Sequence, residues 1–174
     1  MATWIIDSTH SEIGFKVKHL VISTVSGKFT SFEGTIEAEK EDFTDAKISF
    51  SAEVDSIHTG NEQRDGHLKS PDFFDAANNP KIEFVSTAIE HKSGSDYTVT
   101  GDLSIRGTTK PVVLNVEFGG THPNFQGQIV AGFEITSKIN RQDYGLKWSA
   151  VTEAGGIVVS DDVKLVMNVE AVKQ

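Results

Sequence analysis

Apolar and polar residues alternate along most of this chain. In six runs every second side chain is apolar and shares one face, as in a half-buried strand, whereas a helix cannot present such a set. The first of these faces carries Ile13, Phe15, Val17 and His19. The other five consist of Ile48/Phe50/Ala52/Val54, Tyr97/Val99/Gly101/Leu103/Ile105, Val112/Leu114/Val116/Phe118, Ile129/Ala131/Phe133/Ile135 and Val163/Leu165/Met167/Val169. The pattern predicts antiparallel strands with one dry and one wet face.

Two further runs predict strands with irregularities. In residues 28–38 the apolar phase slips between Phe29 and Phe32, which predicts one strand with a bulge or a sharp bend. In residues 81–90 the phase changes at Phe84. Together with the six regular runs, these segments predict about eight strands.

The alternation stops over residues 59–75. There Thr59 and Glu62 fit a capping box, which predicts a short helix near residues 60–68. The sequence contains no linker and no internal repeat. The whole chain, residues 1–174, is therefore expected to form one all-β domain with a short helical insert.

About eight antiparallel strands with one apolar face can pack as a two-sheet sandwich or close into a barrel. The runs reach about ten residues, which favours a tall barrel, and closure also removes exposed strand edges. A barrel of this size either fills its interior with side chains or holds one small ligand. The apolar faces alone are compatible with both interiors.

Composition and charge narrow the range of functions. The chain has 16 basic and 25 acidic residues and a net charge of −9, so a nucleic-acid partner is not expected. It has no cysteine, which excludes disulfides, thiolate metal sites and cysteine nucleophiles. No apolar run is long enough to span a membrane as a helix. The first residues show no secretory signal, so a cytoplasmic location is expected, or a periplasmic one if a signal has been removed.

Candidate chemistry is sparse. The six histidines show neither a His-x-His nor a His-x-x-x-His spacing, so no metal site is predicted. His19 lies on an apolar face, where it is either a core histidine with satisfied hydrogen bonds or a lone polar contact in a pocket. No nucleophile elbow and no phosphate-binding glycine loop is present, so the chain is not expected to be an enzyme. A barrel enzyme for a small apolar substrate and a stress-related interaction protein with a filled core remain the alternatives.

Four motifs, in order along the chain, resemble those of the YceI-like family. They are Trp4-Ile5-Ile6-Asp7-Ser8-Thr9-His10-Ser11, the segment from Ile57 to Asp75 with Arg64-Asp65-x-His67-Leu68-Lys69-Ser70, the run Gly101-Asp102-Leu103-Ser104-Ile105-Arg106-Gly107-Thr108-Thr109-Lys110-Pro111-Val112, and Asn140-Arg141-x-Asp143-Tyr144-Gly145. The resemblance implies a lipocalin-like antiparallel barrel with a helical segment at one end. It also implies a long hydrophobic pocket for an amphiphile with an isoprenoid or fatty acyl chain, and a possible homodimer.

The expected function is to bind, carry or sequester such an amphiphile: an isoprenoid quinone, a polyprenyl compound or a fatty-acid derivative. No other cofactor is expected. In the insert, Arg64, Asp65 and His67 either hold a headgroup as a lid at the barrel mouth or tie the insert to the rim. The predicted ligand-binding residues are the inward-facing Phe15, Val17, His19, Ile48, Phe50, Leu103, Ile105, Leu114, Val116, Phe133, Ile135 and Met167.

Overall fold

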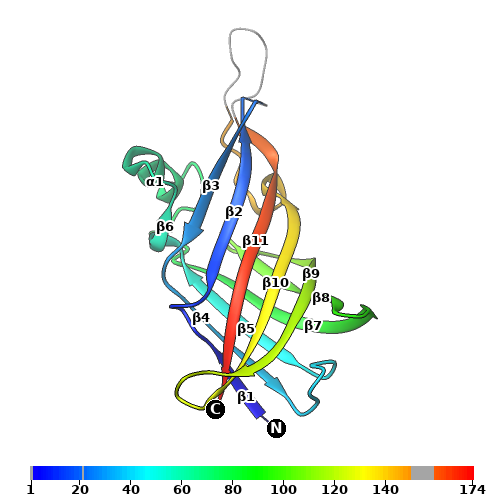
Figure 1. Ribbon diagram of the computed structural model, residues 1–174. Helices are drawn as coiled ribbons and strands as arrows, with labels where there is room; N and C mark the ends of the chain where they lie inside the picture. The colour runs from blue at the N-terminus through cyan, green and yellow to red at the C-terminus, as the bar shows by residue number, and fades with distance from the viewer. Residues whose placement is uncertain (1, 21, 150–158) are drawn as a thin grey trace.

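The computed structural model describes residues 2–20, 22–149 and 159–174. Its strands wind into a closed antiparallel barrel, with one α-helix outside the wall (Figure 1). The elements are β1 (Ala2–Ile6), β2 (Glu12–His19), β3 (Ser23–Phe29), β4 (Phe32–Ala38), β5 (Lys47–Glu53), η1 (Val54–Ser56), β6 (Ile57–His58), α1 (Glu62–Lys69), β7 (Lys81–Ser93), β8 (Asp96–Ile105), β9 (Thr108–Pro123), β10 (Ile129–Asn140), η2 (Arg141–Tyr144) and β11 (Val159–Lys173). Among these residues no helix has the length and apolar character needed to cross a membrane.

Eight strands close the ring in the order β1-β4-β5-β7-β8-β9-β10-β11, and β11 returns to β1. The long strand β11 has two partners on this edge. Its last residues pair with β1, with Ala171 opposite Ile6, and its earlier residues pair with β2, with Val163 opposite Val17. The barrel predicted from the long runs is therefore confirmed, and the sandwich is wrong. We refer to the end that carries α1 as the upper end and to the end where the termini lie as the lower end (Figure 1).

The sharp bend predicted within residues 28–38 is confirmed, but the segment forms two strands and not one. β3 ends at Phe29 and β4 begins at Phe32, with a corner between them. At this corner the Thr30 N–H donates to the Ser56 carbonyl at 3.2 Å, and the Ser31 carbonyl accepts from the Glu53 N–H at 2.9 Å. The slip in apolar phase marks a change of partner strands, because the two halves of the segment pair with different neighbours.

The helical insert begins two residues later than its predicted start. α1 is capped by Asn61, whose side-chain oxygen accepts from the Arg64 N–H at 3.0 Å. The predicted capping box is wrong, because the Thr59 N–H and hydroxyl both donate to the Asp65 carboxylate instead. Thr59 therefore binds the side chain of Asp65 within α1 and does not cap the first turn of the helix.

Regular pairing between β5 and β7 covers only the first part of β7. These strands share five residue pairs, from Glu53 opposite Lys81 to Ser49 opposite Val85. β7 then continues alongside β8, with a bulge between Ser86 and Ala88. Because a bulge bends its strand and increases the local twist, β7 leaves β5 at this point. We call this line the β5–β7 seam.

Candidate functional site

The inner faces of the strands surround a cavity of about 250 Å³. Its walls are aliphatic and aromatic, and the only charged residues that touch it among the described residues are Asp42 and Arg141. On β9, Leu114 and Val116 point inward yet stay only half-buried. In a closed barrel, an inward-facing side chain that is not fully buried borders empty space. The interior is hollow at this level, so the filled-core alternative does not describe it.

The cavity is long and narrow. Along β11 its lining runs from Val159 to Val169, which corresponds to about 33 Å of strand and, with the tilt usual in a barrel, to ~25 Å along the axis. A slender hydrocarbon chain matches this shape. A sugar or a nucleotide would bury polar groups without hydrogen-bond partners.

Eleven of the twelve predicted ligand-binding residues line this cavity. The exception is His19, which is half-buried at the upper end of β2 and is absent from the lining. Its backbone carbonyl accepts from the Ser23 hydroxyl at 3.2 Å. The residues that do line the cavity are Phe15, Val17, Ile48, Phe50, Leu103, Ile105, Leu114, Val116, Phe133, Ile135 and Met167. Whether they contact a ligand stays a prediction.

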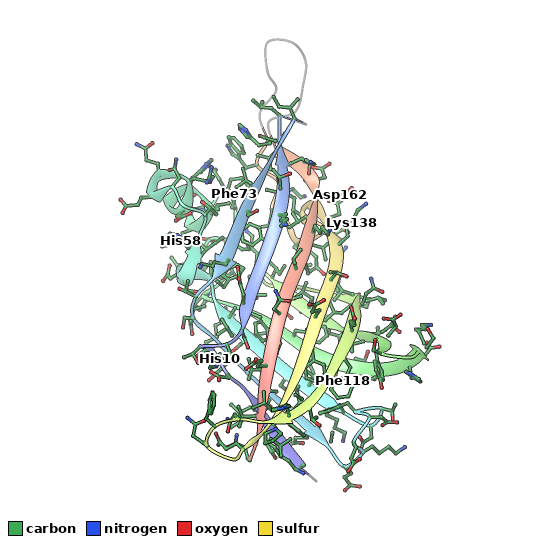
Figure 2. The ribbon with its side chains drawn as sticks, in the orientation of Figure 1. His10, His58, Phe73, Phe118, Lys138 and Asp162 are labelled. Atoms are coloured by element: carbon green, nitrogen blue, oxygen red, sulfur yellow. The ribbon has the colours of Figure 1, made fainter. Side chains whose placement is uncertain are left out.

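An aromatic cluster fills the lower end of the cavity. Phe43, in the β4–β5 loop, has its ring centroid 5.2 Å from that of Trp4, 5.3 Å from that of Phe118 and 5.4 Å from that of Phe133. Phe118, labelled in Figure 2, stacks on Phe133 at 5.2 Å. Sequence reasoning missed Phe43, because it lies in a loop outside every alternating run.

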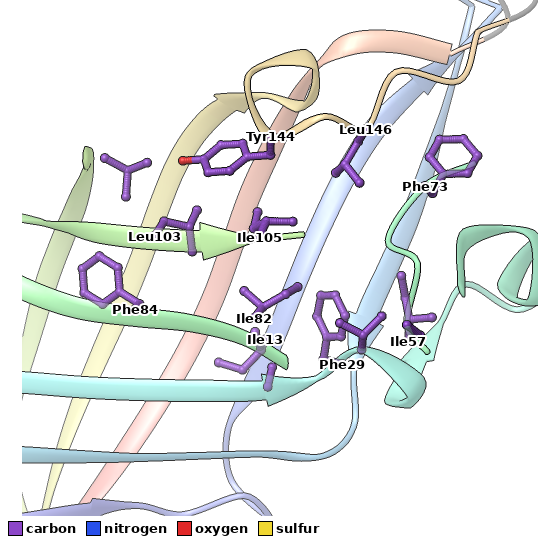
Figure 3. Packing of buried hydrophobic residues seen from close by; sticks show 14 of the residues in the cluster. Ile13, Phe29, Ile57, Phe73, Ile82, Phe84, Leu103, Ile105, Tyr144 and Leu146 are labelled. Carbon is purple, nitrogen blue, oxygen red and sulfur yellow. The ribbon is translucent and has the colours of Figure 1, made fainter. Parts of the chain in front are cut away.

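The insert covers the upper end. Phe73 and Phe74 follow α1 and line the cavity together with Leu146. Figure 3 shows Phe73 and Leu146 among the buried hydrophobic side chains. The Arg106 guanidinium donates to the Phe73 carbonyl at 2.9 Å and to the Gly145 carbonyl at 3.0 Å. Arg106 therefore joins the insert to the turn after β10. Its place in a family-like motif predicts no role for it.

His67 packs inside this upper cover. Its ring lies edge-on to Phe73 at 5.1 Å and to Trp148 at 4.9 Å between centroids. Its Nε2 is 2.9 Å from the Asp72 carboxylate. His67 is absent from the cavity lining among the described residues.

Arg64 and Asp65 are engaged within the insert. The Arg64 guanidinium donates to the Thr59 hydroxyl at 2.8 Å and to the Thr59 carbonyl at 2.6 Å. Asp65 is 8% exposed, and its carboxylate accepts from the N–H and hydroxyl of the same Thr59. These contacts lie within residues 59–65, so the tie to the rim and the headgroup role both stay predictions.

Arg141 is the most deeply buried charged side chain in the described residues, at 2% exposed. Burial lowers the pKa of its guanidinium, and Asp161 opposes that shift from 3.5 Å. An arginine nevertheless stays charged at any physiological pH. Its N–H groups donate to four backbone carbonyls, those of Leu146 at 2.6 Å, Trp148 at 2.7 Å, Ser160 at 3.0 Å and Val159 at 3.3 Å. Arg141 thus holds two chain segments together at the upper end.

Three potential metal ligands converge away from the cavity. The His10 Nδ1 atom is 2.8 Å from Asp7 Oδ2 and 3.9 Å from Glu170 Oε2. The other oxygen of Asp7 accepts from the N–H and hydroxyl of Thr9. Asp7 and His10 thus satisfy each other directly in the loop between β1 and β2. The expectation that the chain has no metal site stays a prediction.

This pair predicts a pH dependence of stability. The hydrogen bond from His10, followed by that from Thr9, lowers the pKa of Asp7, and the Asp7 carboxylate raises the pKa of His10. Because the pKa of Asp7 is lowered in the fold, Asp7 contributes stability in full at pH values above the ordinary carboxyl pKa of 3.8. Because the pKa of His10 is raised, His10 contributes stability in full at pH values below the ordinary histidine pKa of 6.5. The full contribution therefore falls between these two values and fades as pH rises through the folded-state pKa of His10.

We expect Asp7→Asn to lower the melting temperature more at pH 5.5 than at pH 8.5. The control is Asp45→Asn, because the pKa of Asp45 is lowered chiefly by backbone N–H groups, with no histidine among the causes. Its effect should be the same at both pH values. Equal effects of Asp7→Asn at the two pH values would show that the ion pair contributes nothing.

A closed eight-stranded antiparallel barrel around an apolar cavity is the architecture of lipocalin-like proteins. Within that class the chain belongs to the YceI-like domain family, which matches residues 4–171. A UPF0312 protein of Staphylococcus aureus is 39% identical over 171 residues, covering 98% of this chain and 97% of its own length.

Two solved structures extend the comparison. The YceI protein of Campylobacter jejuni is 32% identical, has a TM-score of 0.77 and aligns over 97% of this chain and 96% of its own. A polyisoprenoid binding domain of Saccharophagus degradans, implicated in plant cell wall breakdown, is 18% identical and has a TM-score of 0.68. It aligns over 98% of both chains, and this likeness is one of fold.

Proposed function

We propose that this protein binds one amphiphile, with its hydrocarbon tail in the barrel cavity, and so carries or sequesters it. The observation that carries the proposal is the cavity of about 250 Å³ with its aliphatic and aromatic walls. The fold likeness to a polyisoprenoid binding domain supports it, because that domain has the same architecture. The tails that fit are those of an isoprenoid quinone, a polyprenyl compound or a fatty-acid derivative.

Burial of the tail supplies the affinity. Each CH₂ group removed from water contributes about 0.8 kcal/mol, so ten groups contribute roughly 8 kcal/mol before the cost of association. A pre-formed cavity keeps that cost small, since few side chains need to be ordered on binding. The chain therefore needs no specific polar contact inside the barrel for useful affinity.

Binding fits the cavity better than catalysis does. The Arg141 guanidinium at its upper end is already taken by backbone carbonyls. The carboxylate of Asp42 accepts from the N–H and hydroxyl of Thr44 in its own loop. The remaining titratable side chain of the lining among the described residues is the Tyr97 phenol, so the lining lacks the histidine or carboxylate pair that proton transfer commonly uses. A homodimer and a cytoplasmic location also remain predictions.

The test is the dependence of affinity on tail length. Native mass spectrometry after gentle purification should reveal a bound lipid mass. After delipidation, titration with straight-chain alcohols should show about a fourfold gain in affinity per added CH₂, until the cavity is full and the gain stops. The absence of any lipid mass, together with an affinity independent of tail length, would contradict the proposal.

A further inference from the structure

A second hollow, of about 560 Å³, lies on the outside of the barrel along the β5–β7 seam. We call it the seam groove. Its polar residues come from β4, β5, β7 and the loop between β4 and β5. The groove is lined by Thr35, Glu37, Thr44, Asp45, Ala46, Lys47, Ile48, Ser49, Val85, Ser86, Thr87, Ala88 and Ile89.

The groove and the inner cavity share part of their lining. Ala46, Ile48 and Ile89 border both hollows. The path across the seam therefore runs from polar side chains outside, over three apolar side chains, into the apolar interior. An amphiphile has the same order of groups along its own length, from headgroup to tail.

Few hydrogen bonds join β5 to β7 beside the seam groove. Regular β5–β7 pairing ends at Ser49 and Val85, and the next contact is from the Ile48 N–H to the Ser86 hydroxyl, at 2.9 Å. A side chain there takes the place of the partner strand's carbonyl. The bulge that follows turns β7 away, and Figure 1 shows the β7–β8 hairpin diverging from the β4–β5 hairpin.

The described ends of the barrel are held more firmly than the seam. The Phe43 cluster fills the lower end, and Arg106 and Arg141 tie the upper segments together through backbone carbonyls. Opening either end would break buried aromatic packing or charge-assisted hydrogen bonds. Opening the seam beyond Ser49 breaks one neutral hydrogen bond.

The charges of the groove define the headgroup that it can take. Among the described residues Lys47 is the only cation of the groove, and it lies opposite Glu37 in the β4–β5 register. Asp45 adds a second carboxylate, which accepts from the N–H groups of Glu39 at 2.9 Å and Lys40 at 3.2 Å. A phosphate would meet more negative than positive charge here. The serine and threonine hydroxyls of the groove can form hydrogen bonds with an uncharged headgroup instead.

We propose that the seam groove is the headgroup subsite, and that it takes the uncharged, hydrogen-bonding headgroup of an amphiphile whose tail passes through the seam. A hydroxyl, an amide or a quinone carbonyl has the required chemistry. The inference rests on the proposed function, since it assigns a place to the headgroup of the same ligand. It differs from the sequence-based prediction, which put the headgroup at Arg64, Asp65 and His67.

The first experiment uses the unaltered chain and a C20 isoprenoid alcohol with a diazirine beside its hydroxyl. After irradiation, peptides from residues 35–49 and 85–89 should carry the label. Labelling confined to residues 59–75 would overturn the headgroup subsite and leave tail binding intact. If the alcohol does not bind at all, the proposed function fails together with the subsite. The monophosphate with the same tail should bind at least tenfold more weakly, and an equal or tighter phosphate would overturn the uncharged class.

The second experiment measures the rate of tail entry. Ala46→Trp places a large ring at the shared lining and should slow uptake of the alcohol at least tenfold. Ala77→Trp, at an exposed position after the insert, is the matched control and should load at the original rate. Equal rates for both variants would overturn entry through the seam. If Ala46→Trp does not fold, the labelling experiment alone decides.

Discussion

Replacement of Arg141 by leucine is expected to lower the free energy of unfolding by about 3–5 kcal/mol, because each buried carbonyl left without a donor costs about 1–3 kcal/mol and some of them gain water instead. The guanidinium is 2% exposed and serves four backbone carbonyls. Leucine would leave those carbonyl oxygens without donors in a largely buried setting. Urea denaturation followed by circular dichroism measures the loss.

Arg141→Lys is the informative control. A lysine keeps the charge, but its ammonium is a point donor and cannot reach four carbonyls in the planar geometry of a guanidinium. We expect a loss between those of the leucine variant and the original chain. If the leucine variant were as stable as the original chain, the carbonyls would have to find water, and the upper end would not depend on this side chain.

Ile135→Trp is expected to weaken lipid binding about a hundredfold while the barrel stays folded. Ile135 lies on β10, lines the cavity and is only half-buried, so its neighbours leave space on the inner side. A tryptophan there occupies that space and keeps the tail from passing. Exclusion of four CH₂ groups costs about 3 kcal/mol of binding free energy, which is roughly two orders of magnitude in affinity.

The matched control is Thr136→Trp, because Thr136 is the next residue on the same strand and faces outward. Its affinity for a tail-labelled lipid, measured by fluorescence titration, should equal that of the original chain. The opposite result for Ile135→Trp, with unchanged affinity and a stability loss of 1–3 kcal/mol typical of overpacking, would show a solid interior at that position.

The sequence predicted the lining of the cavity well because a strand has a strict period of two. Once Leu114 was assigned to the dry face, Val116 had to share it, and closure of the barrel turned the dry face inward. His19 follows the same alternation at the last position of β2 but is absent from the lining, although Val159 opposite it on β11 belongs to the lining. Period alone does not tell where along a strand the cavity stops.

The features that close the barrel could not be predicted in this way. Phe43 is in a loop, and loops have no period that reveals which side chain turns inward. Arg106 and Arg141 bind backbone carbonyls, which every residue has, so no partner residue type marks them in the sequence. The corner between Phe29 and Phe32 shows in the sequence as a slip in the apolar alternation. A bulge within one strand and a change of partner strands both produce the same slip, so the sequence does not distinguish them.

The pairing of β1 with β11 has a consequence for how the chain reaches this fold. The ring closes only when residues near position 4 meet residues near position 173, and the Gln174 N–H donates to the Thr3 carbonyl at 2.9 Å. During synthesis the partly built sheet therefore keeps an exposed apolar face and unpaired outer strands until β11 has left the ribosome. Contacts of such large sequence separation slow folding and lengthen the time at risk of aggregation. A circular permutant that joins the two neighbouring termini would make the β1–β11 pairing local and move the late closure to the hairpin that was cut.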